Sequence, residues 1–197
     1  MTVELVLATH NRAKLAELQR ILQRQAVDIR LLSLDDVDYP EPDETGDTFA
    51  ENALIKARAA VAATGKLAVA DDSGLVVDAL GGEPGVRSAR FAGRHGDDRA
   101  NLELVLERMA GVSDRRARFV CVAALVTVDG VEHTAEGVLE GELVHEPRGT
   151  GGFGYDPIFQ PLGAAVTTAE MTPEQKDAVS HRGQAFREIA VAVAQYA

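Results

Sequence analysis

Two adjacent carboxylates, Asp71 and Asp72, interrupt an apolar stretch at residues 67–78, which reads LAVADDSGLVVD. An unpaired charge is costly when buried, so we expect this pair at a strand end, facing a metal ion, a phosphate or a water molecule. Ser73 and Gly74 then predict a turn with an available hydroxyl. The alternative is a strand that simply ends in a polar turn. Neighbouring strand residues point to opposite faces, so only one aspartate should face the site.

A phosphate site is suggested by the segment THNRAK at residues 9–14, which links a predicted strand to a predicted helix. Unsatisfied backbone N–H groups and the helix dipole favour an anion at such a junction. Thr9, Asn11 and Lys14 add a hydroxyl, an amide and an ammonium group. The segment lacks the glycines of a Walker motif, and a plain capped helix explains it equally well.

The few lysines of this acidic chain are further candidates for phosphate binding. The net charge of −11 argues against binding nucleic acid or an anionic membrane, so a polyanionic substrate would need locally gathered cations. Arginine supplies most of the positive charge, and lysine occurs only at positions 14, 56, 66 and 176. A compact ammonium fits beside a phosphate where a guanidinium does not, although chance surface placement explains each lysine singly as well.

Two later segments also carry candidate binding groups. The glycine-rich stretch at residues 149–159, GTGGFGYDPIF, allows close backbone approach to a ligand, and Phe153 or Tyr155 could stack on a flat ring. A flexible hairpin tip is the alternative for this stretch. His181 and Arg182 open the last predicted helix, where two side-chain donors suit an acceptor or an anion.

An acidic loop precedes the second predicted helix, at residues 48–64. Glu44 in this loop could reach a metal ion, although most acidic loops are only solvated surface. On the helix, Asn52 and Lys56 are four residues apart and therefore share one face.

The elements that position these residues follow from hydrophobic periodicity and turn signals. Strands are predicted over residues 3–8, 29–33, 117–128 and 131–145, the last as one strand or two, and residues 67–78 hold the central strand, which Ser73 and Gly74 interrupt. Asp129-Gly130 predicts a hairpin, and residues 80–93 are predicted as a loop. Helices are predicted over residues 14–22, 48–64 and about 98–109, and from 173 and 181 onward. Their predicted caps are Thr9 or Asn11, Thr45 or Asp47, Asp97 or Asp98, Thr172, and Ser180.

Length and composition predict a single domain over residues 1–197, either undivided or with two lobes, and a sizeable core from its 46% hydrophobic content. Cys121, the one cysteine, lies in an apolar run and is expected to be a small buried hydrophobe rather than part of a disulfide. No basic leader precedes the first predicted strand, and no apolar run is long enough to span a bilayer. We therefore expect a cytoplasmic protein without a membrane partner.

Five segments, in order along the whole chain, resemble the inosine triphosphate pyrophosphatase family: ATHNRAK, ETGDTFAENALIKA, ADDSGLVVDALGGEPGVRSARFAG, GTGGFGYDPIF and SHRGQAF. The resemblance implies hydrolysis of ITP, dITP and XTP to the monophosphate and pyrophosphate, with one magnesium ion per subunit and a homodimer. It implies an α/β fold with an elongated mixed β-sheet flanked by helices, in two lobes with the active site in the cleft between them. The one departure, His10, stands where a small or variable residue is expected.

The resemblance also implies roles for individual residues. Asp72, not Asp71, is the proton acceptor, and it binds the metal ion together with Glu44. The implied substrate contacts are Thr9, His10, Asn11, Arg12, Ala13, Lys14, Lys56, Ser73, Phe153, Gly154, Tyr155, Asp156, Lys176, His181 and Arg182.

Selectivity should depend on the base, because inosine and xanthosine carry a 6-oxo acceptor where adenosine carries a 6-amino donor. With adenosine, the donors of His181 and Arg182 would face another donor and lose their hydrogen bond. Such an unpaired buried group costs about 1–3 kcal/mol, which corresponds to a roughly ten- to a hundredfold preference against ATP. A pyrophosphatase for pyrimidine or modified nucleotides is one alternative. A nucleotide sensor without turnover is another, although the carboxylates of Asp72 and Glu44 would hinder phosphate binding unless a metal ion were present.

Overall fold

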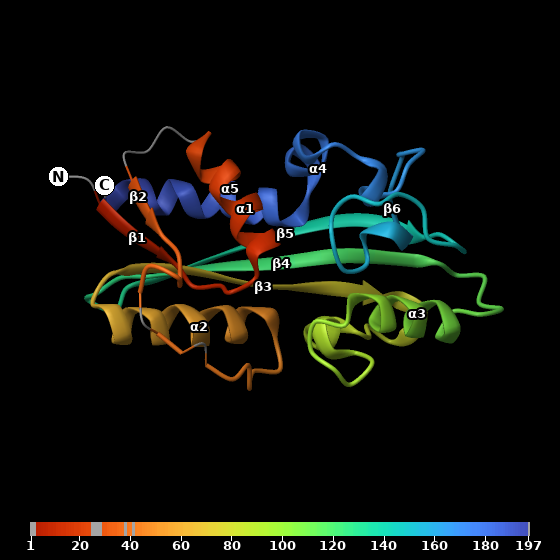
Figure 1. The fold of residues 1–197 in the computed structure, drawn as a ribbon, viewed down its shortest axis with the longest axis horizontal. Coiled ribbons are helices and arrows are strands. Elements are labelled where there is room, and N and C mark those ends of the chain that lie inside the picture. Colours follow the sequence, from red (N-terminus) through yellow and green to blue (C-terminus); the bar gives the residue numbers. More distant parts are fainter. Residues whose placement is uncertain (1–2, 25–28, 38, 41, 197) are drawn as a thin grey trace. The chain divides into compact units, whose positions relative to one another are not determined.

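The computed structural model describes residues 3–24, 29–37, 39–40 and 42–196. Within these ranges, six strands form one sheet in the order β2-β1-β3-β4-β5-β6 (Figure 1). β1 pairs in parallel with both β2 and β3, whereas β5 and β6 are antiparallel, so the predicted mixed sheet is confirmed. The strands are β1 (Val3–Leu7), β2 (Ile29–Leu32), β3 (Leu67–Val77), β4 (Arg116–Val126), β5 (Glu132–Leu143) and β6 (Phe159–Pro161).

The helices begin close to the predicted positions. Asn11, Asp97 and Thr172 cap α1, α3 and α4 through their side chains, as expected. The α-helices are α1 (Arg12–Gln23), α2 (Phe49–Thr64), α3 (Asp98–Arg108), α4 (Pro173–Val179) and α5 (His181–Val193). The 3₁₀ helices are η1 (Asp78–Leu80), η2 (Gly85–Arg90), η3 (Asp156–Ile158), η4 (Thr168–Glu170) and η5 (Ala194–Tyr196).

Three local predictions were wrong. Thr48, rather than Thr45 or Asp47, caps α2, because its hydroxyl and the side chain of Glu51 form a reciprocal capping box. The loop predicted over residues 80–93 contains η2. β3 does not end at the aspartates but continues through Ser73 and Gly74 to Val77, so no turn forms there. The strand continues because cations from other elements compensate both buried carboxylates, as described below.

The chain forms two compact units. The first comprises the described residues up to Asp72, Cys121–Gly137 and the described residues from Arg182 onward. The second comprises Ser73–Val120 and Val138–His181.

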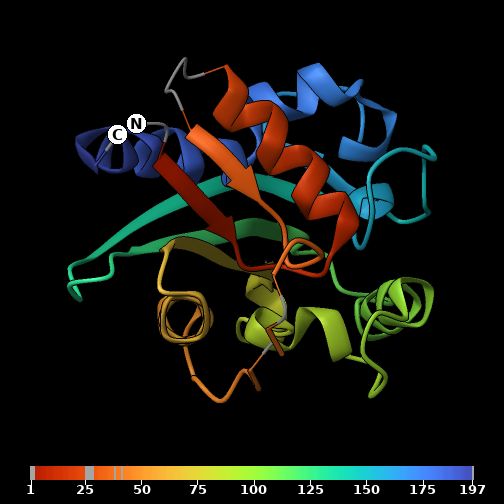
Figure 2. The same ribbon diagram turned by 60° about the vertical axis from the view of Figure 1, so that its left-hand side comes forward.

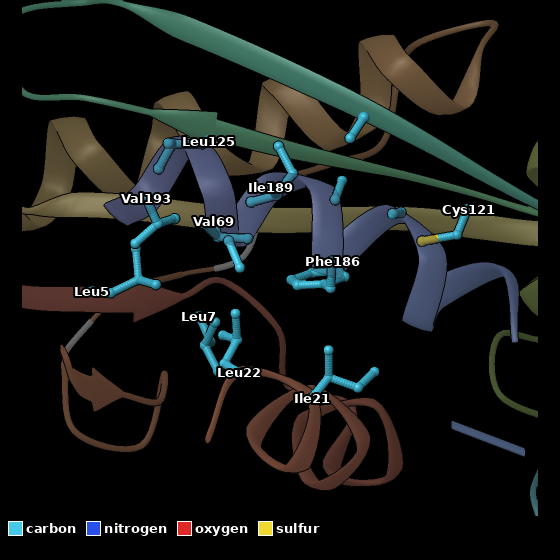
Figure 3. Close-up of a cluster of buried hydrophobic side chains, with 14 of the residues drawn as sticks. Leu5, Leu7, Ile21, Leu22, Val69, Cys121, Leu125, Phe186, Ile189 and Val193 are labelled. Carbon is cyan, nitrogen blue, oxygen red and sulfur yellow. The ribbon is translucent and has the colours of Figure 1, made fainter. Parts of the chain in front are cut away.

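In the first unit, α1 and α5 cover one face of the strands and α2 covers the other (Figure 2). On the α1 and α5 side, Leu5 and Leu7 of β1 lie in one buried cluster with Ile21 of α1 and Phe186 of α5 (Figure 3). Cys121 belongs to this cluster and is buried, as predicted. On the α2 side, the buried apolar residues of the helix are small, which allows the helix to lie close to the sheet: Ala53, Ala57 and Ala60.

In the second unit, α3 and the residue that follows it supply an apolar stripe. Leu102, Val105 and Met109 are buried against Leu75 of β3 and Phe159 of β6. None of the helices in the described part of the chain combines the length and apolar character that a membrane span requires.

Candidate active site

Asp71 on β3 is a buried carboxylate that connects this strand to α1 and α5. Its Oδ2 atom lies 3.1 Å from Nζ of Lys14 and 3.3 Å from Nε of Arg182. Arg182 also pairs through Nη1 with Oε2 of Glu17, at 2.5 Å. Burial alone would raise the pKa of Asp71, but Lys14 and Arg182 outweigh it and hold the pKa well below its usual range. Asp71 is therefore ionised, and its charge fixes the positions of two cations.

Asp72 has partners from α2 instead. Nδ2 of Asn52 donates to Oδ2 of Asp72 at 3.1 Å, and Nζ of Lys56 lies 3.7 Å from Oδ1. Burial raises the pKa of Asp72, and the charge of Glu44 adds to the rise while Lys56 opposes it. The two aspartates thus contact helices on opposite faces of the sheet, as strand alternation predicts. A carboxylate with a raised pKa suits a proton acceptor.

Lys56 joins Asp72 to the acidic loop that precedes α2. Its Nζ atom lies 2.6 Å from Oε1 of Glu44, in a site where Lys56 itself is buried. Burial alone would lower the pKa of Lys56, but the carboxylates of Asp72, Asp71 and Glu44 outweigh it and raise the pKa. The ammonium group is therefore charged.

Asn52 fixes the same loop to the helix. Its Oδ1 atom accepts a hydrogen bond from the backbone N–H of Gly46 at 2.8 Å. A Cβ atom at Gly46 would lie only 2.8 Å from that oxygen and 2.6 Å from Cβ of Glu51, so the approach requires glycine. The loop that carries Glu44 is thereby held against α2.

A magnesium ion fits the donor set around Lys56. One oxygen of Glu44 and one of Asp72 both lie near Nζ of Lys56, so two carboxylates converge on one cation position. No group of three or more His, Cys, Asp or Glu side chains in the described ranges is arranged to hold a metal ion. Magnesium is commonly bound by one or two carboxylates, with waters and substrate phosphates completing its shell.

The segment at residues 9–14 forms the capped start of α1, and side chains accept several of its backbone N–H groups. Oδ1 of Asn11 accepts the backbone N–H groups of Ala13 and Lys14, both at 3.1 Å. Oγ1 of Thr9 accepts the backbone N–H of Asn11 at 3.2 Å. The prediction that these backbone donors are unsatisfied was wrong, because side chains of the same segment satisfy three of them.

In the second unit, Asp156 organises the glycine-rich segment. Its Oδ2 atom accepts from Nζ of Lys176 at 2.6 Å and from the backbone N–H of Phe153 at 2.8 Å. Its Oδ1 atom accepts from Oγ1 of Thr168 at 2.8 Å. Gly152 packs so closely that a Cβ atom there would lie 2.0 Å from Oδ2 of Asp156. Asp156 therefore fixes both the loop and the Lys176 ammonium.

The two aromatic candidates in this segment differ in their surroundings. The Tyr155 ring is in the core of the second unit, and its hydroxyl donates to the backbone carbonyl of Ser88 at 2.8 Å. Burial, with the charge of Asp98, raises the pKa of Tyr155. The Phe153 ring is half-buried, and Nζ of Lys176 lies 4.8 Å from its centroid.

The two predicted donors at the start of α5 differ in their surroundings. The His181 ring stacks on Phe119, with centroids 4.8 Å apart and planes 14° apart. The Arg182 guanidinium is 2% exposed and contacts Glu17 and Asp71, as described above.

The first unit thus gathers one set of predicted residues around residues 71–72: Lys14, Glu44, Lys56, Asp72 and Arg182. The second unit holds another set, of which Phe153, Asp156 and Lys176 contact one another. Ser73 is half-buried on β3, and the side chains of His10, Arg12 and Ala13 are exposed.

Sequence reasoning missed three buried polar residues that support these sets: Glu17, Asn52 in its link to Asp72, and Thr168. Glu17 lies three residues after Lys14 on the inner side of α1, which is a detectable signal because such residues share a helix face. Thr168 has no comparable local signal.

Comparison with known proteins gives matches over nearly the whole chain. Residues 5–192 match the Ham1 family. A Streptomyces avermitilis protein named dITP/XTP pyrophosphatase is 55% identical over 188 residues, which cover 94% of each chain. The solved structure of a HAM1 protein from Coxiella burnetii has a TM-score of 0.89 and 44% identity, covering 98% of this chain and 100% of that one. A Mycobacterium abscessus structure, named nucleoside-triphosphatase / dITP/XTP pyrophosphatase, has a TM-score of 0.77 and 51% identity, covering 96% and 98%.

Proposed function

This chain belongs to the Ham1 family, and from that membership we propose that it hydrolyses non-canonical purine nucleoside triphosphates to the monophosphate and pyrophosphate. The names of relatives more than half identical to this chain suggest dITP and XTP as substrates, and ITP is included because it carries the same base as dITP. The observation that carries the proposal is the buried Asp72, fixed by Asn52 and lying with Glu44 beside one ammonium group. If Asp72 only stabilised the fold, its ion pair with Lys56 would not require the second carboxylate of Glu44 beside the same ammonium group.

Asp72 is the proton acceptor in this reaction. A water oxygen forms a bond to the α-phosphorus, its proton passes to the Asp72 carboxylate, and the bond from that phosphorus to the pyrophosphate oxygen breaks. The Asn52 hydrogen bond fixes the carboxylate, so the base is oriented before substrate binds. Glu44 and Asp72 would hold one magnesium ion per subunit, which when bound supplies charge neutralisation at the phosphate oxygens.

The triphosphate is contacted by residues 9–14 together with Lys56, Ser73 and Lys176. Thr9 and Ser73 supply a hydroxyl, Asn11 an amide, and Arg12 and the three lysines a cation, all of which are groups that bind phosphate oxygens. Within residues 153–156, Phe153 stacks on the purine, while Tyr155 and Asp156 hold the segment in place. His181 and Arg182 donate to the 6-oxo group of the base. The half-buried position of the Phe153 ring supports the stacking role.

The proposal extends to the organisation of the protein. β3, β4 and β5 each contribute residues to both compact units, which supports residues 1–197 acting as one catalytic domain. We propose a homodimer of such domains. Its location is the cytoplasm, because the nucleotide pool on which it acts is found there.

Magnesium-dependent release of pyrophosphate tests the proposed function. The unaltered protein is assayed with ITP, dITP, XTP, ATP, GTP and pyrimidine nucleoside triphosphates, with magnesium or with EDTA. We expect pyrophosphate from ITP, dITP and XTP, much less from the others, and none with EDTA. Release of orthophosphate instead, or a preference for pyrimidine nucleotides, would refute the proposal.

A further inference from the structure

Lys56 occupies the point at which the two proposed metal ligands converge. Its Nζ atom is 2.6 Å from Oε1 of Glu44 and 3.7 Å from Oδ1 of Asp72. All three side chains belong to the first unit, with exposed fractions of 4% for Lys56, 21% for Glu44 and 7% for Asp72. Lys56 therefore already supplies a cation at the two-carboxylate site.

A divalent cation bound by the same oxygens would lie within a few ångströms of this ammonium group. Like charges at such a distance repel strongly where water is largely excluded. The two carboxylates also have few further protein ligands to add, because the described part of the chain holds no cluster of three metal-ligating side chains. A hard divalent cation with two protein ligands normally takes its remaining ligands from substrate phosphates and water.

We propose that the Lys56 ammonium holds the place of the divalent cation until nucleotide binds, so that the cation enters only together with a triphosphate. Lysine suits this role because its ammonium is a compact charge on a flexible four-carbon stem. When the triphosphate arrives, the ammonium leaves the carboxylates for phosphate oxygens, and the cation takes its position. This inference rests on the proposed function, because it concerns the same two carboxylates.

Binding of Mn²⁺ alone tests this role without turnover. Free Mn²⁺ is measured by electron paramagnetic resonance during titration of the unaltered protein, first without nucleotide and then with the α,β-methylene analogue of ITP. We expect little uptake of Mn²⁺ alone and uptake of one ion per subunit with the analogue. In Lys56→Met and Lys56→Gln, Mn²⁺ alone should bind at least tenfold more tightly, because the competing charge is gone.

Two further variants locate the effect. Lys66 forms an ion pair of the same 2.6 Å length with Glu4 in the same unit, so Lys66→Met is the matched control and should not change Mn²⁺ binding. Adding Glu44→Gln to Lys56→Met should abolish the gain. The inference is overturned if the unaltered protein binds Mn²⁺ alone as tightly as the Lys56 variants, or if Lys66→Met produces the same gain. A protein that releases no pyrophosphate from ITP refutes the proposed function instead, and the titration still decides the role of Lys56.

Discussion

The side-chain amide of Asn52 donates to Oδ2 of Asp72 across 3.1 Å, with both residues buried. Its other end accepts the backbone N–H of Gly46, in the loop that carries Glu44. An amide carries a donor and an acceptor on separate atoms without a charge, so one side chain can serve both groups. Asn52 therefore connects the proposed base to the loop of the second proposed metal ligand.

Replacing Asn52 with alanine should impair both stability and catalysis. The change leaves a buried carboxylate oxygen and a backbone N–H without this partner, which should cost about 2 kcal/mol in the free energy of unfolding. Turnover of ITP should fall further than stability predicts, because Asp72 is no longer oriented. Asn101→Ala is the matched control, since Asn101 is a buried amide that likewise bridges two groups, the Ala92 N–H and the Ala89 carbonyl. Equal losses of kcat in the two folded variants would contradict the orienting role.

The two neighbouring aspartates should respond differently to loss of charge. Asp71→Asn leaves Lys14 and Arg182 without their shared buried carboxylate, and breaking a buried ion pair costs about 3–5 kcal/mol. Asp72→Asn removes the proposed base, so it should abolish turnover of ITP while changing stability less. Chemical denaturation and a pyrophosphate assay measure the two effects. Similar, mild losses of activity in both variants would show that neither carboxylate is the base.

Arg182→Ala should narrow the preference for ITP over ATP. If Arg182 donates to the 6-oxo group, its loss removes a contact that ATP cannot make, and the ratio of specificity constants should fall about tenfold. The variant should also be less stable, because Glu17 and Asp71 both lose a buried partner. The ratio is measured on folded protein, and an unchanged ratio would exclude a role in reading the base.

Local sequence signals were sufficient for most of the fold. The hairpin predicted at Asp129-Gly130 forms, but its tight turn is centred on Val128 and Asp129 rather than on the predicted two residues, because the Gly130 N–H donates to the Thr127 carbonyl. Side-chain caps such as Asn11 act within three residues, so a short window contains the whole interaction. The cap of α2 was predicted at Thr45 or Asp47, three residues or one residue too early, because several polar residues compete immediately before that helix.

The continuation of β3 could not be predicted from such windows. Whether a strand tolerates Asp71 depends on Lys14 and Arg182, which are 57 and 111 residues away along the chain. Alternation along the strand did predict that the two aspartates face opposite sides. It could not identify their partners, and so the links of Glu17 to Arg182 and of Thr168 to Asp156 were missed.

Tyr155→Phe should change the alkaline pH dependence of stability. Burial raises the pKa of Tyr155 above its ordinary value of about 10, so the unfolded chain ionises more readily than the folded protein. The stability that depends on a protonated Tyr155 is fully present below pH 10. As the pH rises further, the free energy of unfolding falls by up to about 1.4 kcal/mol per pH unit. The Tyr155→Phe variant lacks this ionisable hydroxyl, so its free energy of unfolding should fall less steeply above pH 10. At pH 7 it should lose only about 1 kcal/mol, for the hydrogen bond to Ser88. Parallel curves above pH 10 would contradict this.

Gly152→Ala should displace the proposed nucleotide-binding residues of the second unit, because it forces Asp156 to move. The glycine has φ of +69°, and the added Cβ would lie 2.0 Å from Oδ2 of Asp156. That oxygen must then move away from Lys176 and from the Phe153 N–H. We expect the KM for ITP to rise at least tenfold, because both proposed contacts lose their anchor.

The backbone strain of the substitution needs its own control. Gly163 has a similar φ of +78° but nothing within 4 Å of an added Cβ, so Gly163→Ala carries only the left-handed penalty, about 1–2 kcal/mol. Its KM for ITP should stay unchanged. A Gly152→Ala protein that is merely destabilised to the same extent, with an unaltered KM, would show that Asp156 does not position the nucleotide-binding residues.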